Sequence, residues 1–231
     1  MEYNYLKPKE TPVTYILVMT NIIVFVALEI LGDTQSSAFM LVNGAMNPYM
    51  VLHFHQWYRL FTCIFLHFGI EHLANNMLLL FLLGQIFERA VGSTRYFGIY
   101  LGSGIAGSFL SFFYMSLMNQ NYISAGASGA IFGIVGGMIV VIICHKGRYK
   151  WITTKQMIFM ALLTLYFGYS STGVDNAGHV GGLITGAIAT FFSYGIGVIY
   201  NRHKAKAEES SVDIEEEKPY TLNNNDETNG Q

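Results

Sequence analysis

Hydrophobic residues in this chain occur in long continuous runs and do not alternate with polar residues. Six such runs span residues 13–31, 68–87, 96–118, 125–144, 151–168 and 177–200. About 20 apolar residues in a helix cross a bilayer. The strands of a membrane β-barrel, in contrast, are about 10 residues long, and apolar and polar residues alternate along them. The pattern therefore predicts an all-α membrane bundle of six transmembrane helices. The fifth run is the least apolar, because Lys155 interrupts its start.

The overall composition indicates an integral membrane protein. The 231 residues are 52% hydrophobic and only 12% charged, and the mean hydropathy is +0.37. An ordinary soluble domain has about 25% charged residues. The lipid bilayer is therefore the expected environment, and no nucleic-acid partner is expected. The first run is long and five more follow it, so we interpret it as a retained helix and not as a signal peptide.

Basic residues predict the orientation of the chain. With the N-terminus in the cytoplasm, the outer side receives Arg59, whereas the inner side receives eleven basic residues. These are Lys7, Lys9, Arg89, Arg95, Lys146, Arg148, Lys150, Lys155, Arg202, Lys204 and Lys206. This asymmetry is typical of cytoplasmic loops. Both termini are then cytoplasmic, and the second, fourth and sixth spans run from outside to inside.

Three kinds of segment follow from this topology. Residues 1–12 form a cytoplasmic N-terminal segment, and residues 13–200 form the membrane domain. Within that domain, residues 32–66 form an outer loop rich in aromatic residues, which predicts an element lying in the lipid headgroup region. Residues 201–231 are first basic, then acidic and Asn-rich, and we expect a disordered cytoplasmic tail.

The candidate chemistry lies in three separate spans. Ser128 begins the fourth apolar run, His179 lies at the start of the sixth, and His72 with Asn76 lies near the start of the second. All three spans begin outside, so these side chains share a depth of roughly 5 to 10 Å below the outer boundary. Polar groups in a bilayer are costly and are functional-site candidates. Taken singly, each of them is also compatible with simple helix packing.

Glycine spacing predicts which of these helices are in contact. Glycines repeat every four residues on the fourth span, at 129, 133 and 137, and on the sixth, at 178, 182 and 186. Such faces allow membrane helices to approach closely. Contact between the two faces would bring Ser128 within hydrogen-bond reach of His179, which is the arrangement that activates a serine nucleophile.

The ordered set of motifs resembles the rhomboid family of intramembrane serine proteases. The family pattern G-x-S-G is matched by Gly126, Ser128 and Gly129, and the H-x-x-x-N pattern by His72 and Asn76. On the sixth span the family pattern is matched by His179, Gly182 and Gly186, with Gly178 in place of the usual alanine. In the first loop, the Trp-Arg signature is matched by Trp57 and Arg59, with one residue inserted between them. The segment Glu88-Arg89, with Gly84 and Gly92, is also similar to the family. The resemblance covers roughly residues 57–186 and is to bacterial members with six helices.

The resemblance implies a role for each of these residues. Ser128 is the expected nucleophile and His179 the general base, with no carboxylate required. His72, Asn76 and the backbone N–H of Ser128 are expected to stabilise the oxyanion. Spacing alone leaves Asn75 as an alternative to Asn76, because both can share a face with His72. Supporting roles fall to Gly126, Gly129, Phe132, Gly182, Gly186, Trp57 and Arg59.

Two further side chains near the site have structural expectations, and the sequence also bears on metals and cofactors. Phe132 is expected below the His179 ring, and Asp175 is expected to have a structural role near the loop end. His53 and His55 have no further paired ligands. We therefore expect neither a metal site nor a cofactor.

The function implied is hydrolysis of peptide bonds in or near transmembrane segments of other membrane proteins, by a serine endopeptidase of a bacterial plasma membrane with its site near the outer face. Substrates are expected to reach the site between the second and fifth spans, with the loop at 170–176 as a cap. Two alternatives stay open: a proteolytically inactive relative that binds and escorts membrane proteins, and a small transporter or channel. The oligomeric state is also left open.

Overall fold

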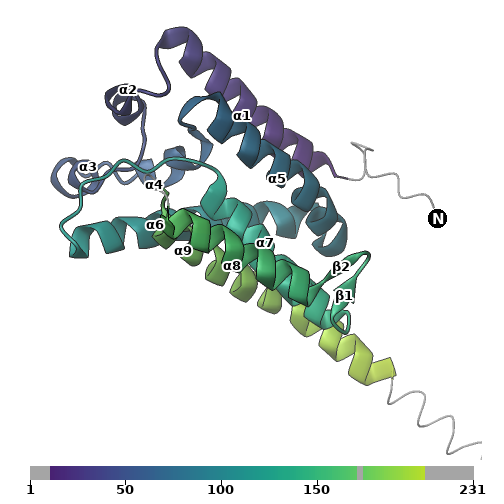
Figure 1. Cartoon of the computed structure of the whole chain (residues 1–231). Helices are drawn as coiled ribbons and strands as arrows, with labels where there is room; N and C mark the ends of the chain where they lie inside the picture. Colours follow the sequence, from purple (N-terminus) through teal and green to yellow (C-terminus); the bar gives the residue numbers. More distant parts are fainter. Residues whose placement is uncertain (1–10, 171–173, 206–231) are drawn as a thin grey trace, which may run out of the picture.

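The computed structural model describes residues 11–170 and 174–205, apart from the side chains of residues 167–170. Six main helices form the bundle in Figure 1: α1 (Pro12–Leu31), α5 (Gly69–Val91), α6 (Ser93–Leu117), α7 (Ser128–Cys144), α8 (Thr154–Ser170) and α9 (Asn176–Thr190). Short helices α2 (Ser37–Val42), α3 (Pro48–Phe54) and α4 (Arg59–Thr62) and a 3₁₀ turn at Cys63–Phe65 connect α1 to α5. The predicted helical membrane bundle is confirmed.

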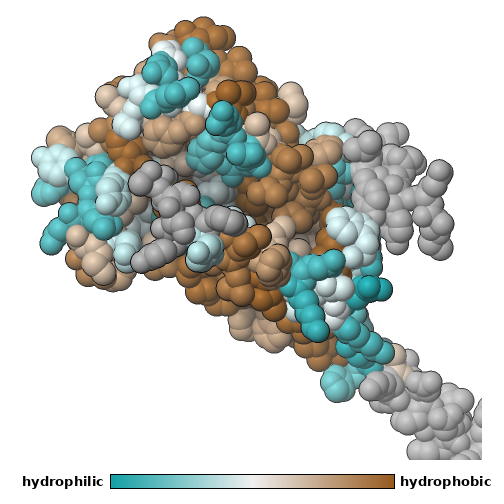
Figure 2. Space-filling model, in the orientation of Figure 1, coloured by the Kyte–Doolittle hydropathy of each residue, from teal (hydrophilic) through white to brown (hydrophobic). Residues whose placement is uncertain are grey.

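The main helices differ in how well their length suits a bilayer. Within the described residues, four are long and apolar enough to cross a membrane: α1, α5, α6 and the continuous helix from Asn176 to Ala205. This last helix comprises α9, a π-helical turn at Phe191–Gly195 and the residues that follow it. Helices α7 and α8 have 17 residues each, or roughly 25 Å at 1.5 Å per residue. Figure 2 shows a largely hydrophobic surface across the middle of the bundle, with mixed hydrophilic and hydrophobic patches toward α2 and α3 and hydrophilic residues toward the end of the C-terminal helix.

Several helix boundaries differ from the sequence prediction. The fourth helix was expected from residue 125, but it begins at Ser128, because Gly126 has φ +139° and its N–H bonds to the carbonyl of Cys63. The fifth helix was expected from residue 151, but residues 148–153 form a β-hairpin of β1 (Arg148–Tyr149) and β2 (Ile152–Thr153). The sixth extends five residues past its predicted end at 200. Residues 1–10 of the predicted N-terminal segment and most of the predicted tail lie outside the described residues, and α1 already begins at Pro12.

Helix α7 is the central element of the bundle. It packs against α6 and α9 along most of its length, and its buried residues include Ile134, Met138, Val141 and Ile142. A helix that is apolar all round is typical of such a central position. Ser128, at its first residue, is therefore held by the best-packed helix of the molecule.

A buried carboxylate attaches α1 to α5. Glu88, on α5, accepts hydrogen bonds from the backbone N–H groups of Val13 and Thr14 at 3.0 and 2.8 Å. It also accepts from the hydroxyls of Thr14 and Ser93, both at 2.7 Å. These bonds satisfy the free N–H groups at the start of α1. Glu88, one of the residues that match the family pattern, thus caps the start of α1 from the neighbouring helix α5.

The outer loop is held together by a buried arginine. Arg59 donates to the carbonyls of Leu41 and Ala45 at 2.6 and 2.7 Å and to the side-chain oxygen of Gln56 at 2.6 Å. Trp57 lies half exposed, with its ring edge-on to Phe112. Both predicted supporting residues therefore order the loop, and they do not contact Ser128 or His179. A headgroup location for this loop stays a prediction.

Candidate active site

Ser128 is placed at the N-terminus of α7 by a tight turn. Gly126 adopts a positive φ that favours glycine, and the N–H of Ala127 donates to Nε2 of His67 at 3.4 Å. Burial, with a smaller contribution from nearby His72, lowers the pKa of His67 to about 3, so this ring stays neutral and can accept. The free N–H groups at the start of α7 point into the site, where the helix dipole favours negative charge.

His179 lies in the first turn of α9, opposite Ser128. Asp175 caps this helix, because its Oδ1 accepts from the N–H of Gly178 at 2.8 Å and its backbone carbonyl from the N–H of His179 at 3.1 Å. The distance between Nε2 of His179 and Oγ of Ser128 is 2.8 Å. Two residues 51 positions apart in the chain thus share a hydrogen bond of normal length.

The contact between α7 and α9 depends on glycine. A Cβ at Gly182 would overlap the carbonyl oxygen of Gly129, and one at Gly186 would overlap that of Gly133. The predicted packing of the two glycine faces is therefore confirmed over these residues. Gly137 also faces α9, but its neighbour there is the side chain of Thr190 and not a glycine, with Phe87 of α5 beside it.

The His179 ring is oriented by stacking. Phe132 lies parallel to it, with ring centroids 4.4 Å apart and an interplanar angle of 12°. Nδ1 of His179 is buried and has no hydrogen-bond partner among the described residues. Asp175 does not fill that place: its Oδ1 caps α9, and its Oδ2 accepts from the hydroxyl of Ser124 at 2.6 Å. The geometry is that of a Ser–His pair without a carboxylate.

His72 directs a ring N–H toward the same turn. Its Nδ1 accepts from the N–H of Phe68 at 3.3 Å, so in the neutral ring Nε2 holds the proton. That Nε2 lies beside Gly126: a Cβ placed there would be 2.9 Å from Nε2 of His72 and 3.7 Å from Oγ of Ser128. His72 therefore presents a donor close to the Ser128 hydroxyl.

The structure separates the two asparagines that spacing left as alternatives. Asn76 is buried, and its amide donates to the carbonyl of His72 at 3.0 Å, which leaves its second N–H for another acceptor. Asn75 is exposed on a different face of α5. Only Asn76 belongs with the buried polar residues at this end of the bundle.

Several contacts at the site were not predicted from the sequence. These include the Ser124–Asp175 hydrogen bond and the participation of α6, where a Cβ at Gly107 would lie 2.6 Å from the carbonyl oxygen of Gly178. Small residues recur along α6 at positions 102, 103, 104, 107 and 108, and they were the available indication of close packing. Within the described residues no group of three or more His, Cys, Asp or Glu side chains could hold a metal ion.

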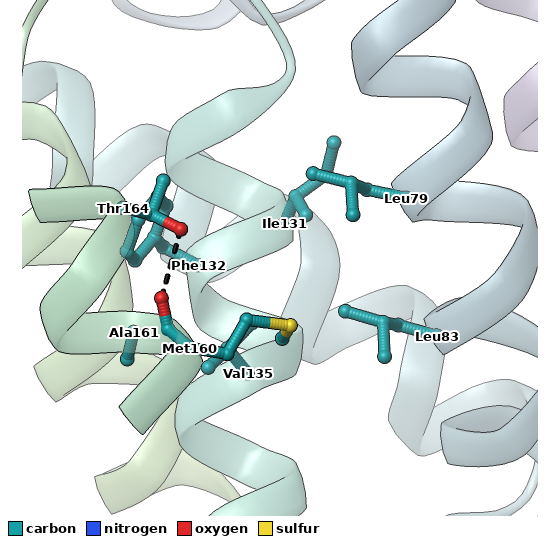
Figure 3. A pocket seen from close by; sticks show the side chains of 8 residues that line it. All are labelled: Leu79, Leu83, Ile131, Phe132, Val135, Met160, Ala161 and Thr164. Atoms are coloured by element: carbon teal, nitrogen blue, oxygen red, sulfur yellow. Dashed lines mark hydrogen bonds between the residues drawn. The ribbon is translucent and has the colours of Figure 1, made fainter. Parts of the chain in front are cut away.

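An apolar pocket lies beside Phe132. Figure 3 shows its lining by side chains of three helices: Leu79 and Leu83 of α5, Ile131, Phe132 and Val135 of α7, and Met160, Ala161 and Thr164 of α8. The hydroxyl of Thr164 donates to the carbonyl of Met160, so the pocket presents almost only apolar groups. The predicted cap at residues 170–176 falls partly outside the described residues.

Comparison with known proteins agrees with this architecture. A model of the rhomboid domain matches residues 54–195. The chain is 38% identical over 176 residues to the rhomboid protease GluP of Bacillus subtilis, an overlap covering 76% of this chain and 34% of GluP. It is 39% identical over 150 residues to RHOMBOID-like protein 1 of Arabidopsis thaliana, covering 64% of this chain and 37% of that protein.

A third relative, RHOMBOID-like protein 2 of Arabidopsis thaliana, is 40% identical over 153 residues, covering 65% of this chain and 47% of that protein. The chain thus spans less than half the length of these relatives. The matched region nevertheless contains α5 to α9 and all the residues of the Ser128 site. The chain is an integral membrane protein and belongs to the rhomboid family.

Proposed function

We propose that this protein is an intramembrane serine endopeptidase that cleaves membrane proteins in or near their transmembrane segments. The observation that supports this most directly is the 2.8 Å separation of Nε2 of His179 from Oγ of Ser128. A serine hydroxyl is a weak nucleophile until an adjacent base can accept its proton. A family relative named as a protease adds support.

In the proposed mechanism, Nε2 of His179 removes the proton from Ser128 as Oγ attacks the scissile carbonyl carbon. The carbonyl oxygen becomes an oxyanion, and the C–N bond then breaks as His179 returns the proton to the leaving amine. A water molecule next attacks the acyl-enzyme, again with His179 as base, and releases the new carboxyl terminus. One water is consumed, and Ser128 is regenerated.

Three donors are proposed to stabilise the oxyanion. They are Nε2–H of His72, the amide of Asn76 and the backbone N–H of Ser128, all at the outer end of α5 and α7. Donors fixed in advance in a site shielded from water stabilise developing charge strongly. The positive end of the α7 dipole acts in the same direction.

Substrate access is proposed to run between α5 and α8. The apolar pocket in Figure 3 lies between these helices and ends at Phe132, whose ring stacks on His179. The apolar lining of this pocket suits a transmembrane segment arriving from lipid. A hydroxylated or charged substrate surface would lose hydrogen bonds there.

The proposed orientation has both termini in the cytoplasm and the site near the outer face of a bacterial plasma membrane. Figure 1 shows the start of α1 and the end of the C-terminal helix at one end of the bundle, with α2, α3 and α4 at the other. The excess of Lys and Arg at the end with the termini supports this orientation.

Cleavage in a reconstituted system tests the proposal. Proteoliposomes containing a labelled transmembrane substrate are compared for wild type, Ser128→Ala, His179→Ala and the control Ser116→Ala, whose native hydroxyl bonds within α6. We expect cleavage by wild type and the control only. Cleavage by Ser128→Ala at the wild-type rate would refute the proposal, and solute flux that survives Ser128→Ala would favour a transporter. Substrate binding without cleavage in wild type would favour an inactive escort protein.

A further inference from the structure

The hairpin between α7 and α8 is an ordered structure at the end of the bundle opposite to Ser128. Arg148 pairs with Thr153 and Tyr149 with Ile152, and Lys150 and Trp151 form the tip. Lys150 adopts φ +54°, as a tight two-residue turn requires. The hairpin follows α7, so it lies roughly 25 Å from Ser128 along that helix.

The base of the hairpin is packed against the bundle, and its tip carries a largely exposed side chain. Ile152 is buried, Tyr149 lies edge-on to His145 with ring centroids 4.9 Å apart, and the N–H of Thr154 bonds to the carbonyl of Gly147 at 3.2 Å. Trp151, in contrast, is 60% exposed. A largely exposed indole is thus carried by a well-anchored turn at the end of the bundle where α7 ends and α8 begins.

The hairpin also concentrates positive charge. Lys146, Arg148, Lys150 and Lys155 lie within ten residues, and no aspartate or glutamate occurs between Glu88 and Asp175. Glu88 is buried and already bonded to the start of α1, and Asp175 caps α9 near the other end. The C-terminal helix adds Arg202, whose guanidinium donates to the carbonyl of Cys144 at the end of α7. No carboxylate of segment 89–174 can therefore compensate this charge.

We propose that this hairpin is a binding site for anionic phospholipid headgroups, with Trp151 inserted at the headgroup level. Phosphate oxygens accept charge-assisted hydrogen bonds from Arg and Lys, and tryptophan favours the membrane interface. Cations at an anionic bilayer surface each add attraction that salt screens. Because α8 begins at Thr154, directly after β2, bound lipid also fixes the cytoplasmic end of the helix that lines the apolar pocket.

The two tryptophans of the chain, Trp57 and Trp151, provide a direct test. In full-length Trp57→Phe protein, Trp151 is the only tryptophan. This protein is reconstituted in one mixture of phosphatidylcholine and phosphatidylglycerol, with bromines on the acyl chains of either lipid. We expect stronger quenching of Trp151 by brominated phosphatidylglycerol at equal mole fraction, by roughly two- to fivefold. The ratio should fall in high salt.

Matched variants assign this preference to the hairpin. Arg148→Gln with Lys150→Asn should bring the quenching ratio to one, and asparagine tolerates the positive φ at 150. Arg148→Lys with Lys150→Arg keeps both charges and should keep the ratio, as should Lys204→Gln, which removes a charge elsewhere at the same end. A ratio of one in the parent protein, or one unaffected by charge removal in the hairpin, would overturn the proposal.

The acidic stretch at residues 215–217 is the competing occupant. If it covered the hairpin, Glu215→Gln with Glu216→Gln and Glu217→Gln would raise the quenching ratio several-fold, and that result would also overturn the proposal. We expect no change. The quenching ratio does not depend on proteolysis. The lipid-binding proposal can therefore fail while the proposed protease function holds, and the protease function can fail while lipid binding holds.

Discussion

At the scale of single residues, the site depends on which polar atoms of each side chain already have a hydrogen-bond partner and which remain available for a substrate. Nδ1 of His72 accepts from the N–H of Phe68, so Nε2 is left as a donor beside Ser128. The carboxylate of Asp175 bonds Gly178 and Ser124, and Nδ1 of His179 has no hydrogen-bond partner among the described residues. Phe132 orients the imidazole by stacking instead. Two neighbouring side chains of the same site, Asn76 and His67, are the subject of predictions at this scale.

Asn76→Ala should lower the rate of the chemical step, because it removes an oxyanion donor. Loss of one such donor typically costs about 100- to 1,000-fold in kcat. The exposed neighbour Asn75 is the matched control, and Asn75→Ala should have no more than a small effect. The measurement is kcat and KM on a reconstituted transmembrane substrate. Equal losses in the two variants, or a change in KM alone, would contradict the proposed role of Asn76.

His67→Gln should make the protein less sensitive to acid. The folded-state pKa of about 3 lies below the ordinary value of 6.5, so between these values the unfolded state binds the extra proton. Stability is therefore lost as pH falls from about 6.5 toward 3, at about 1.4 kcal/mol per pH unit. Thermal unfolding in detergent at pH 4 to 7 should show a shallower pH dependence for His67→Gln. Parallel curves would contradict the neutral His67 at the Ala127 turn.

Most residues of the candidate site could be identified from the sequence, but some of their contacts could not. Ser128, His179 and His72 were found from their depth in apolar runs and from motif resemblance. The choice of Asn76 over Asn75 rested on resemblance, since spacing permits both, and it is burial that separates them. The Ser124–Asp175 bond had no sequence signal, because it joins a loop and a helix start 51 residues apart.

At the scale of elements, close approach of α7 and α9 is what brings the hydroxyl and the imidazole together. Four-residue glycine spacing was enough to predict this contact, since a glycine face has few other uses in a membrane helix. The close approach of α6 was not predicted, although its small residues at 103, 107 and 111 also recur every four positions. The hairpin at 148–153 was missed as well, since it depends on positive φ at Lys146, Gly147 and Lys150, and lysine gives no indication of such a turn.

Gly182→Ala should separate α7 from α9. The added Cβ would meet the carbonyl of Gly129, and overpacking of this kind typically costs about 1–3 kcal/mol. The control is Gly197→Ala in the same continuous helix, where nothing lies within 4 Å of the new Cβ. Thermal unfolding in detergent should show a lower Tm for Gly182→Ala only. An unchanged Tm in both would contradict the close helix contact.

At the scale of the whole molecule, polar and charged residues divide between the two ends of the bundle. The end with α2, α3 and α4 holds the Ser128 site, whereas the end with the hairpin holds most of the basic residues. The number of main helices and their order followed from the hydrophobic runs. The helix boundaries at 128 and 154 did not, because backbone geometry at a glycine and a hairpin decides them.

The proposed orientation predicts which end a membrane-impermeant thiol reagent can reach. Both native cysteines are buried, so they contribute little background. In intact cells Asn119→Cys, exposed after α6, should be labelled, whereas Lys155→Cys, exposed at the start of α8, should be labelled only after the membrane is permeabilised. The reverse pattern would place the site on the cytoplasmic side.

The most direct test of the central claim, that Ser128 is a nucleophile activated by His179, is covalent labelling by a fluorophosphonate followed by mass spectrometry of the modified peptide. We predict a single adduct on Ser128 in wild type, with labelling lost in His179→Ala although that variant keeps the hydroxyl. An adduct on another serine, or labelling of Ser128 at an unchanged rate in His179→Ala, would contradict the Ser128–His179 dyad.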